Sequence, residues 1–406
     1  MVREHLIYTH HALSIGITDT RIASQREQHH TLRVARVYAD GCVGLASAYG
    51  DVPMAALEQQ AEAALTIGVP YAPAPTADST SSGSVDHHTM SGPDLTRFTE
   101  DLLGRLRREC PDFIFANRVI QESKQLQLHN DRGMQHTFRS REAGVGLTIR
   151  AKGSPNIIDA AVGMEIISPP DPAAITRHVG ARLDRWNEVE APTPGKVQVV
   201  FEGLRTLELP FARDLRAQVF HSNTSMFQRE HAPLHERFVL YDSLAPRFGN
   251  PAFDNEGTLR NDPELRLLDA SGVRSVAACK RDALRYDRPV TGNGHGGHTS
   301  LPSTAFGHLR LGETCDDLAS LIGGQPTLWI DLAAGSDCGP LGDYAVPVAV
   351  AWILDEAGQV VGRTGGFTLT GNLFEMFGAD YLGTTVTTSS PYSHDGWVGT
   401  RMTIAG

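Results

Sequence analysis

Two histidines and a glutamate in the second half of the chain have the types and spacing of a metal-dependent hydrolytic site. His231 and His235 are four residues apart, and Glu236 follows the second imidazole. On a helix the two rings would share one face, as metal ligands do. Pro233 lies between them and argues against a regular helix unless this segment is a first turn. A metal-free segment is therefore the favoured interpretation, and a metal site is the alternative.

A second candidate is the carboxylate pair Asp254 and Glu256, within the sequence Phe-Asp-Asn-Glu-Gly at residues 253–257. Two neighbouring carboxyl groups could transfer a proton to or from a substrate. The same residues also suit a tight turn that Asn255 caps and Gly257 closes, and this structural interpretation is favoured. The catalytic candidates are His231, His235, Glu236, Asp254 and Glu256.

The glycine-rich run Thr291–His298 contains the Gly-x-Gly-x-x-Gly spacing of dinucleotide-binding loops. That spacing binds a nucleotide only between a strand and a helix. Residues 285–289 are not an apolar strand, and Leu-Pro-Ser at 301–303 does not begin a helix. We therefore interpret the run as a backbone excursion that glycine permits.

Other hydrolase and metal signatures are weak or missing. The chain contains no Gly-x-Ser-x-Gly elbow and no phosphate-binding P-loop. Three histidine pairs, at 10–11, 29–30 and 87–88, are neighbours in sequence, so their rings should point apart, and we expect them at the surface.

Composition limits the protein class. A chain of 406 residues with 41% hydrophobic residues can bury a large core and is expected to form two domains. The net charge of −11 argues against a nucleic-acid surface. No apolar run reaches membrane-spanning length and no signal peptide is evident, so we expect a cytoplasmic protein without membrane contact. The five cysteines are widely spaced, which fits reduced thiols.

Local patterns predict the elements of the first half. Residues 31–47 are typical of two β runs joined at Asp40-Gly41, and a helix should open at 51–53. Residues 72–93 are rich in Pro, Ser, Thr and Gly, which predicts a flexible loop. Apolar spacing predicts helices from Asp94 and over Ala173–Trp186, with a hairpin between them that turns at 131–133.

The best domain boundary is the segment Ala191–Gly195, where two prolines and a glycine interrupt every periodicity. We expect an N-terminal α+β domain over 1–190 and a β-rich C-terminal domain over 195–406. Short β runs dominate the second domain, for example 348–354 and its return at 360–361. Gly371-Asn372 should end a strand in a turn of positive φ. Strands and helices do not alternate regularly, which favours an α+β class over a doubly wound sheet.

Several segments of the chain, in order, resemble the TldD/TldE (PmbA) metallopeptidase family. The resemblance covers nearly the whole chain, is strongest from Phe238 onward, and implies the two-domain fold of that family. Within it we assign the role of contacting a peptide to Gly292, Asn293, Gly294, His295 and His298. The matching segments are 239–244, 253–257, 291–298, 336–344, 368–372 and 402–406.

The resemblance also implies where a zinc site should be. In the TldD branch, zinc is held by the histidines of a His-Glu-x-x-x-His helix and a later cysteine, and the glutamate activates water. No such hexapeptide occurs in this chain. Alignment puts Phe211–Arg216 in its place, and Thr384–Ser390 where the cysteine should be. The resemblance is thus closest to TldE, a metal-free subunit that pairs with a zinc-bearing TldD subunit to process short, unfolded or modified peptides.

Two alternatives stay open. The chain could be a stand-alone hydrolase or transferase that uses the candidate residues in altered chemistry. It could also be a non-cleaving module that captures an extended peptide along a strand edge. In the leading hypothesis this chain holds no metal or other cofactor, zinc resides in a TldD-like partner, and the pair forms a heterodimer or higher assembly.

Overall fold

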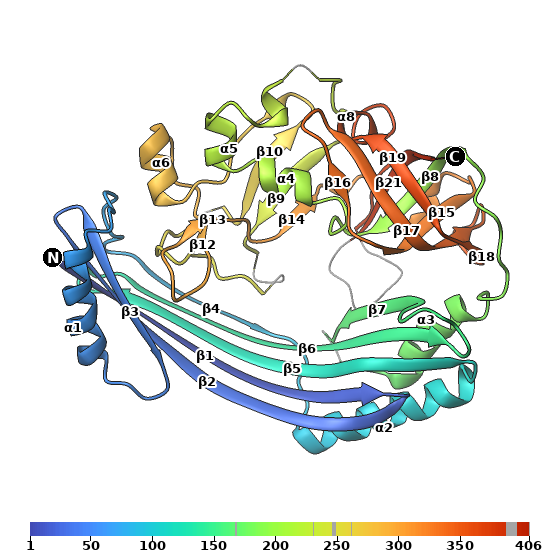
Figure 1. Cartoon of the computed structure of the whole chain (residues 1–406), viewed down its shortest axis with the longest axis horizontal. Coiled ribbons are helices and arrows are strands. Elements are labelled where there is room, and N and C mark those ends of the chain that lie inside the picture. The colour runs from blue at the N-terminus through green and yellow to red at the C-terminus, as the bar shows by residue number, and fades with distance from the viewer. Residues whose placement is uncertain (167–168, 230, 246–248, 261, 387–395, 406) are drawn as a thin grey trace.

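The computed structural model describes residues 1–166, 169–229, 231–245, 249–260, 262–386 and 396–405. A long curved sheet built from the first half of the chain runs beneath the second half (Figure 1). Its strand order is β3-β2-β1-β5-β6-β4, and β7 also pairs with β6. The strands are β1 Val2–Thr18, β2 Arg21–Ala39, β3 Cys42–Tyr49, β4 Thr80–Asp86, β5 Phe113–Asn130, β6 Gln135–Ala151 and β7 Ala160–Glu165.

Both predicted hairpins are confirmed, although their strands are much longer than expected. Asp40 and Gly41 have φ of 50° and 75°, as a tight hairpin turn requires, and Ala39 pairs with Cys42. The strand β1 was not predicted at all. Its residues alternate between the two faces of the sheet, but polar and charged side chains occur on both faces, so no simple apolar pattern marks it.

Residues 72–93 are not one loop, which corrects the prediction. Thr80–Asp86 forms strand β4 and pairs in parallel with β6 along its whole length. Only Val85 is buried in this strand. An edge strand can be held by backbone hydrogen bonds with little apolar burial, and composition therefore gives no signal for it.

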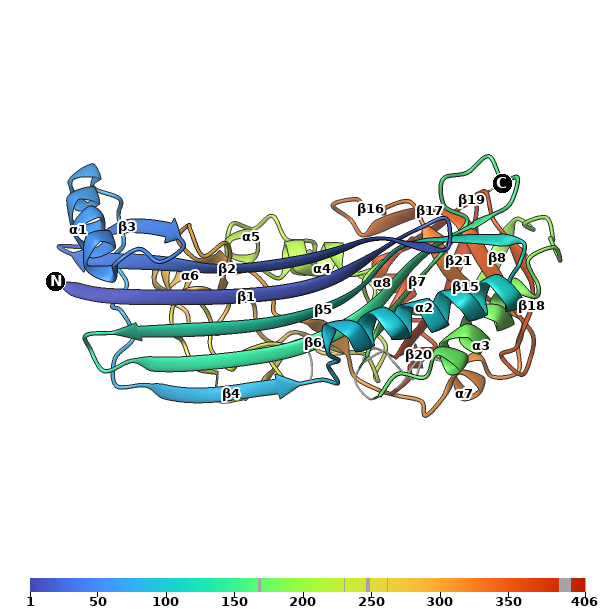
Figure 2. The same ribbon diagram turned by 90° about the horizontal axis from the view of Figure 1, so that it is seen from below.

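Helices cover the outer face and the end of the long sheet (Figure 2). The predicted helix near Asp94 is α2, Gly92–Glu109, which begins two residues earlier because Ser91 caps it. Its apolar stripe from Leu95 to Leu106 is buried against β1, β2 and β5. The remaining helices of this half are α1 Met54–Ala64, the short 3₁₀ turn η1 Leu65–Ile67, and α3 Pro172–Leu183.

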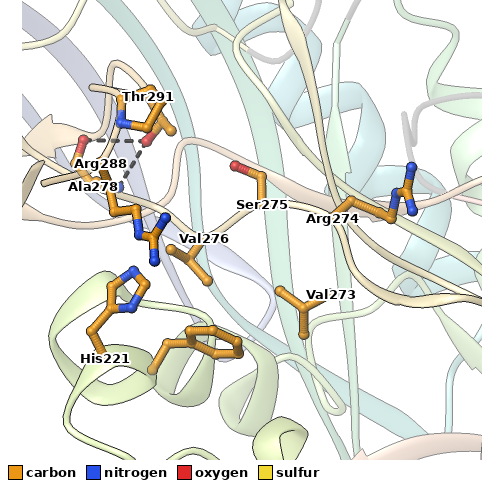
Figure 3. A pocket seen from close by; sticks show the side chains of 10 residues that line it. His221, Val273, Arg274, Ser275, Val276, Ala278, Arg288 and Thr291 are labelled. Atoms are coloured by element: carbon orange, nitrogen blue, oxygen red, sulfur yellow. Dashed lines mark hydrogen bonds between the residues drawn. The ribbon is translucent and has the colours of Figure 1, made fainter. Parts of the chain in front are cut away.

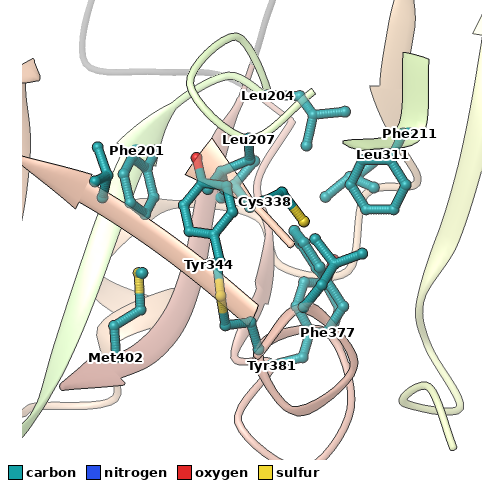
Figure 4. Close-up of a cluster of buried hydrophobic side chains, with 14 of the residues drawn as sticks. Phe201, Leu204, Leu207, Phe211, Leu311, Cys338, Tyr344, Phe377, Tyr381 and Met402 are labelled. Carbon is teal, nitrogen blue, oxygen red and sulfur yellow. The ribbon is translucent and has the colours of Figure 1, made fainter. Parts of the chain in front are cut away.

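A small barrel forms the centre of the second half. The strands follow the order β15-β8-β21-β19-β17, and β15 also pairs with β17, which closes the ring. The buried side chains of Figure 4 fill the barrel and its surroundings. The strands of this sheet are β8 Gly195–Glu202, β15 Thr327–Ala333, β16 Asp337–Cys338, β17 Asp343–Leu354, β18 Val360–Thr364, β19 Phe367–Asn372, β20 Gly383–Thr384 and β21 Trp397–Ile404.

Gly371-Asn372 does not form the predicted turn. The strand β19 continues through both residues, and Asn372 has a φ of −119° and caps the helix that follows. A Cβ on Gly371 would lie 3.0 Å from the sulfur of Met376, so close packing explains this glycine better than positive φ.

The rest of the second half consists of smaller sheets and short helices. A four-stranded sheet has the order β11-β10-β9-β14, and β12 pairs with β13. These elements are β9 Val239–Ser243, β10 Glu264–Asp269, β11 Gly272–Val273, β12 Gly294–His295, β13 Ser303–Thr304, β14 Leu309–Leu311, α4 Leu209–Asp214, α5 Ala217–His221, η2 Met226–Gln228, α6 Lys280–Tyr286, α7 Leu318–Ile322 and α8 Leu373–Met376.

The α+β class is confirmed, since strands and helices mix without regular βαβ alternation. The division at 191–194 stays a prediction. In the described ranges, no helix combines the length and the apolar character needed to cross a bilayer.

Candidate functional site

The turn at residues 253–257 is the point where the second half of the chain docks on the long sheet. Asp254 Oδ1 accepts hydrogen bonds from the backbone N–H groups of Glu256 (3.0 Å) and Thr258 (2.9 Å). Gly257 closes the turn with a φ of 70°. The turn was predicted, but Asp254 caps it and Asn255 does not. Asn255 instead binds the glycine-rich run through its backbone N–H and its side-chain amide.

Glu256 is a deeply buried carboxyl group of this turn. Only 3% of it is exposed, and its two oxygens accept hydrogen bonds from the Tyr71 hydroxyl (3.0 Å) and the Lys280 backbone N–H (2.7 Å). Burial raises the pKa of Glu256 to about 7, and the nearby Asp254 carboxylate adds to this shift. Burial also raises the pKa of Asp254, against the hydrogen bonds that its oxygens accept. The two candidate carboxyl groups therefore lie together, but neither is open to solvent.

The glycine-rich run fits around the same carboxyl groups. Gly294 donates its N–H to Asp254 Oδ2 at 2.7 Å. A Cβ on Gly294 would lie 2.5 Å from Glu256 Oε2, so only glycine fits this position. The run therefore serves as a lid over the turn, as the interpretation of a glycine-permitted excursion expects.

The long sheet holds the turn through a buried ion pair. The guanidinium of Arg36 is 1% exposed and donates from Nη1 to Glu4 Oε1 (3.0 Å) and to the Asn255 carbonyl oxygen (2.6 Å). Tyr38 donates its hydroxyl to the same Glu4 oxygen at 3.0 Å. Charge-assisted hydrogen bonds of this kind are about twice as strong as neutral ones.

Further contacts close the junction on the other side of the turn. His136 stacks on Phe253 with ring centroids 4.7 Å apart, and its Nε2 lies 3.1 Å from the Gly257 carbonyl oxygen. Thr76 donates its hydroxyl to the Glu256 carbonyl oxygen at 2.8 Å. The Lys280 ammonium donates to the Thr76 hydroxyl at 2.5 Å. The junction is thus a polar network that fixes one half of the chain against the other.

The five peptide-contact candidates divide into two groups. Gly292, Asn293 and Gly294 are buried, and Asn293 bonds Asp242 and receives a hydrogen bond from Arg260. Those three residues maintain the local backbone and are not accessible to a ligand.

His295 and His298 are partly exposed, and in the described structure neither His295 Nε2 nor His298 Nδ1 has a hydrogen-bond partner. The ring of His298 lies 4.8 Å from that of Tyr8 on the inner face of the long sheet. Burial lowers the pKa of both imidazoles, which favours their neutral forms. Among the five candidates these are the two whose side chains are partly exposed, although the two unpartnered nitrogen atoms are buried.

The His231, His235 and Glu236 cluster does not form. Residues 231–235 have no helical structure, so the helical spacing on which the metal hypothesis depends is absent. The ring of His231 stacks on Phe374 with centroids 4.0 Å apart, and His235 Nδ1 accepts the backbone N–H of Arg237. Glu236 is exposed. The two imidazoles are therefore engaged separately.

The segment expected at the zinc motif forms a helix whose side chains do not suit a metal ion. Phe211 on α4 is fully buried and packs against Phe227, Phe238 and Phe377. Asp214 is the one carboxylate in Phe211–Arg216, and it is paired with Arg213 at 2.8 Å.

The described part of the region expected to hold the cysteine also contains no thiol. In that region the hydroxyl groups of Thr384 and Tyr381 lie 2.7 Å apart, and residues 387–390 lie outside the described part of the chain. Within the described ranges, no three His, Cys, Asp or Glu side chains converge as metal ligands.

The histidines of each pair on the long sheet point apart as predicted, and one member of each pair is more exposed than the other. His10 and His11 lie on opposite faces of β1, where His10 contacts Glu122 (3.0 Å) and His11 contacts Glu27 (2.8 Å). The side chain of His10 is only 14% exposed, so this residue is less exposed than predicted.

Sequence reasoning did not find the residues of the long sheet and its following loop that bind the turn: Glu4, Arg36, Tyr38, Tyr71 and Thr76. The sequence signal that could have identified them is a charged residue at a strand position that faces the core. Glu4 and Arg36 face each other across β1 and β2, on the same side of the sheet as the apolar pair Leu6 and Val34. A charged pair in line with apolar residues on one face indicates a buried, specific contact.

Comparison with known proteins agrees with this architecture. A family model described as the PmbA/TldA metallopeptidase C-terminal domain matches residues 194–394. The structure of TldE from Thermococcus kodakarensis is similar over 100% of this chain and 97% of its own, with a TM-score of 0.82 and 15% identity. No curated protein sequence gives a significant match.

Two further structures are similar over the full length of the chain. A Thermotoga maritima protein, described as a candidate modulator of a DNA gyrase, has a TM-score of 0.75 at 13% identity and is covered to 96%. A Bacteroides thetaiotaomicron protein with a similar description has a TM-score of 0.74 at 13% identity and is covered to 94%. These likenesses show that the chain has the two-domain fold of TldE.

Proposed function

The chain belongs to the TldD/TldE (PmbA) metallopeptidase family, and we propose that it is the TldE-like, metal-free subunit of a heteromeric zinc peptidase. In this proposal a TldD-like partner supplies the zinc and the water-activating glutamate. The substrates are short, unfolded or modified peptides, which the assembly degrades or matures in the cytoplasm.

One observation carries the proposal. The helix that follows β8, where the family places its zinc motif, is built into the hydrophobic core through Phe211. A fully buried aromatic ring at this point stabilises the fold, and it supports the proposal because an aromatic hydrocarbon side chain is not a zinc ligand. The sequence is consistent with this, since it contains no His-Glu-x-x-x-His hexapeptide anywhere.

The role left to this chain is to shape a cavity and to hold a substrate. The polar junction around Glu256 fixes the glycine-rich run over the long sheet, and His295 and His298 of this run are partly exposed. Two neutral imidazoles can donate or accept hydrogen bonds with a peptide backbone. We therefore expect these side chains to position peptide, while proton transfer and water activation belong to the partner.

The experiment is a reconstitution with a TldD-like subunit from the same genome. Each subunit is purified alone and together, and hydrolysis of an unstructured peptide is measured along with zinc content. We expect hydrolysis only from the pair, with zinc bound by the partner. Replacing the glutamate of the partner's zinc motif with glutamine should abolish activity, because the base is lost.

Three outcomes would contradict the proposal. Metal-free hydrolysis by the lone chain would make it an enzyme in its own right. Tight peptide binding by the lone chain, unchanged by the partner, would favour a non-cleaving binding module. Stoichiometric zinc in the lone chain would show that it builds a site from its own side chains.

A further inference from the structure

A pocket of about 310 Å³ lies on the second half of the chain, apart from the junction around Glu256 (Figure 3). It is bordered by α5, the segment 273–278 and the loop 288–291. Its apolar lining comes from Phe220, Val273, Val276 and Pro289. A volume of this size is at the lower end of what small-ligand sites occupy.

The backbone around this pocket is fixed by hydrogen bonds. Ala217 at the start of α5 donates its N–H to the Ala277 carbonyl oxygen at 2.8 Å, and Ala277 donates to Leu215 at 2.9 Å. On the opposite side, the Thr291 hydroxyl accepts the Ala278 N–H at 2.7 Å. The pocket is therefore formed before any ligand arrives.

Two donor groups of the pocket have no acceptor among the described residues: the exposed Arg288 guanidinium and the buried His221 Nε2. Figure 3 shows the Arg288 guanidinium next to the His221 ring. His221 Nε2 is buried and has no hydrogen-bond partner among the described residues. Among the described residues, Arg288 forms no ion pair and no side-chain hydrogen bond. No acidic residue lines the pocket.

A second guanidinium stands at the edge of the pocket. Arg274 also lines the pocket, but its guanidinium forms an ion pair with Asp269 (3.6 Å) and donates a hydrogen bond to the Ser271 hydroxyl (3.1 Å). Because Arg274 already has an anionic partner, the unmatched charge belongs to Arg288. One guanidinium next to one imidazole suits a single carboxylate, which a guanidinium can bind through two parallel hydrogen bonds.

We propose that this pocket binds a carboxylate joined to a short branched apolar group, with Arg288 and His221 donating to the carboxylate. Val273, Val276 and Phe220 contact the apolar group. Such a ligand is either a free small acid or the C-terminal residue of a short peptide, and both present the same chemistry. The site does not depend on the proposed zinc-bearing partner, so the two proposals can fail independently.

The test uses the full chain and calorimetric titration with N-acetyl-L-leucine. N-acetyl-L-leucinamide is the matched neutral probe, because it differs only at the carboxylate. We expect the acid to bind at least about tenfold more tightly than the amide, since a charge-assisted pair is lost in the amide. A second acid, N-acetyl-alanyl-leucine, separates the sources: tighter binding of the dipeptide identifies a peptide terminus, and weaker binding identifies a small acid.

The variants are Arg288→Gln and His221→Gln. Arg288→Gln should weaken binding of the acid about tenfold and leave the amide unaffected. Arg285→Gln is the matched control, because Arg285 lies on the neighbouring α6 over the Tyr286 ring and does not line the pocket. In histidine-labelled NMR spectra of the wild-type chain, the His221 resonances should shift on addition of the acid and not on addition of the amide. This measurement does not depend on the folding of either variant.

Equal binding of acid and amide would overturn the proposal. Absence of binding by the acid at concentrations up to about 10 mM would also overturn it, because the binding free energy would then be weaker than about 3 kcal/mol. Unchanged affinity in both variants, with native far-UV spectra, would also overturn it.

Discussion

The Tyr71 hydroxyl donates a 3.0 Å hydrogen bond to Glu256 across 185 residues of sequence. Tyr71 follows the first helix of the chain, and Glu256 lies in the turn that carries the second half onto the long sheet. Both side chains are buried. This contact is one of several polar contacts that join the two halves around the buried turn.

Removing the Tyr71 hydroxyl should destabilise the chain. In Tyr71→Phe the Glu256 Oε1 atom stays buried without that donor, which costs about 1–3 kcal/mol. Urea unfolding followed by fluorescence measures this loss. Tyr49→Phe is the control, because Tyr49 is 64% exposed and no hydrogen bond of its hydroxyl is seen in the described structure. Equal midpoints for the two variants would show that the Tyr71 contact contributes nothing.

The raised pKa of Glu256 predicts a pH-dependent stability. Its pKa is about 7 in the folded chain and near 4.5 in an unfolded one. Between these values the folded state holds more protons, so the free energy of unfolding contributed by this group falls as pH rises from about 4.5 to about 7. The full effect is about 3 kcal/mol, since one pKa unit corresponds to about 1.4 kcal/mol.

Glu256→Gln isolates this contribution. Glutamine resembles the protonated acid: its oxygen can accept the Lys280 N–H and its amide can donate to Tyr71. The stability difference between wild type and Glu256→Gln, from urea unfolding at pH 5 to 8, should shift by about 2.5 kcal/mol in favour of the variant as pH rises. Glu236→Gln, at an exposed position, should follow wild type. A pH-independent difference would mean that Glu256 titrates normally.

The parts of the fold with local signals were predictable from sequence. The stripe from Leu95 to Leu106 repeats at helical spacing, and Asp40-Gly41 favours a hairpin by its own backbone preferences, so both were found. The strand β4 was missed because it is held by pairing with β6, and local composition does not report on that partner.

The site was less predictable than the fold. The Asp254 turn and the glycine-rich run were recognised, because their residue types limit the local backbone. The partners of the turn were missed, because Glu4 and Arg36 acquire their role only when a segment more than 200 residues away docks on them. Conversely, the spacing of His231 and His235 suggested a cluster that the actual backbone does not form.

The Glu4–Arg36 pair should be strongly coupled. Glu4→Gln leaves the Arg36 charge buried, and Arg36→Met leaves the Glu4 carboxylate buried, so each should cost about 3–5 kcal/mol. The double variant should cost less than the sum, because it removes both charges. A double-mutant cycle by urea unfolding measures the coupling. Arg97→Met at the exposed Arg97–Asp94 pair should cost less than about 1 kcal/mol. Additive effects within about 0.5 kcal/mol would refute the coupling.

Phe211 tests whether the helix α4 is part of the core. Its ring is fully buried among three other phenylalanines, so Phe211→Ala removes a large packed group and leaves a cavity. Such truncations cost about 3–5 kcal/mol. Leu209→Ala on the same helix is the matched control: Leu209 is 54% exposed, and its loss should cost well under half as much. Unfolding of the lone chain provides the measurement, with zinc content determined in parallel. If Phe211→Ala were no more destabilising than Leu209→Ala, the ring would not be a core residue, and the main support for a metal-free subunit would be lost.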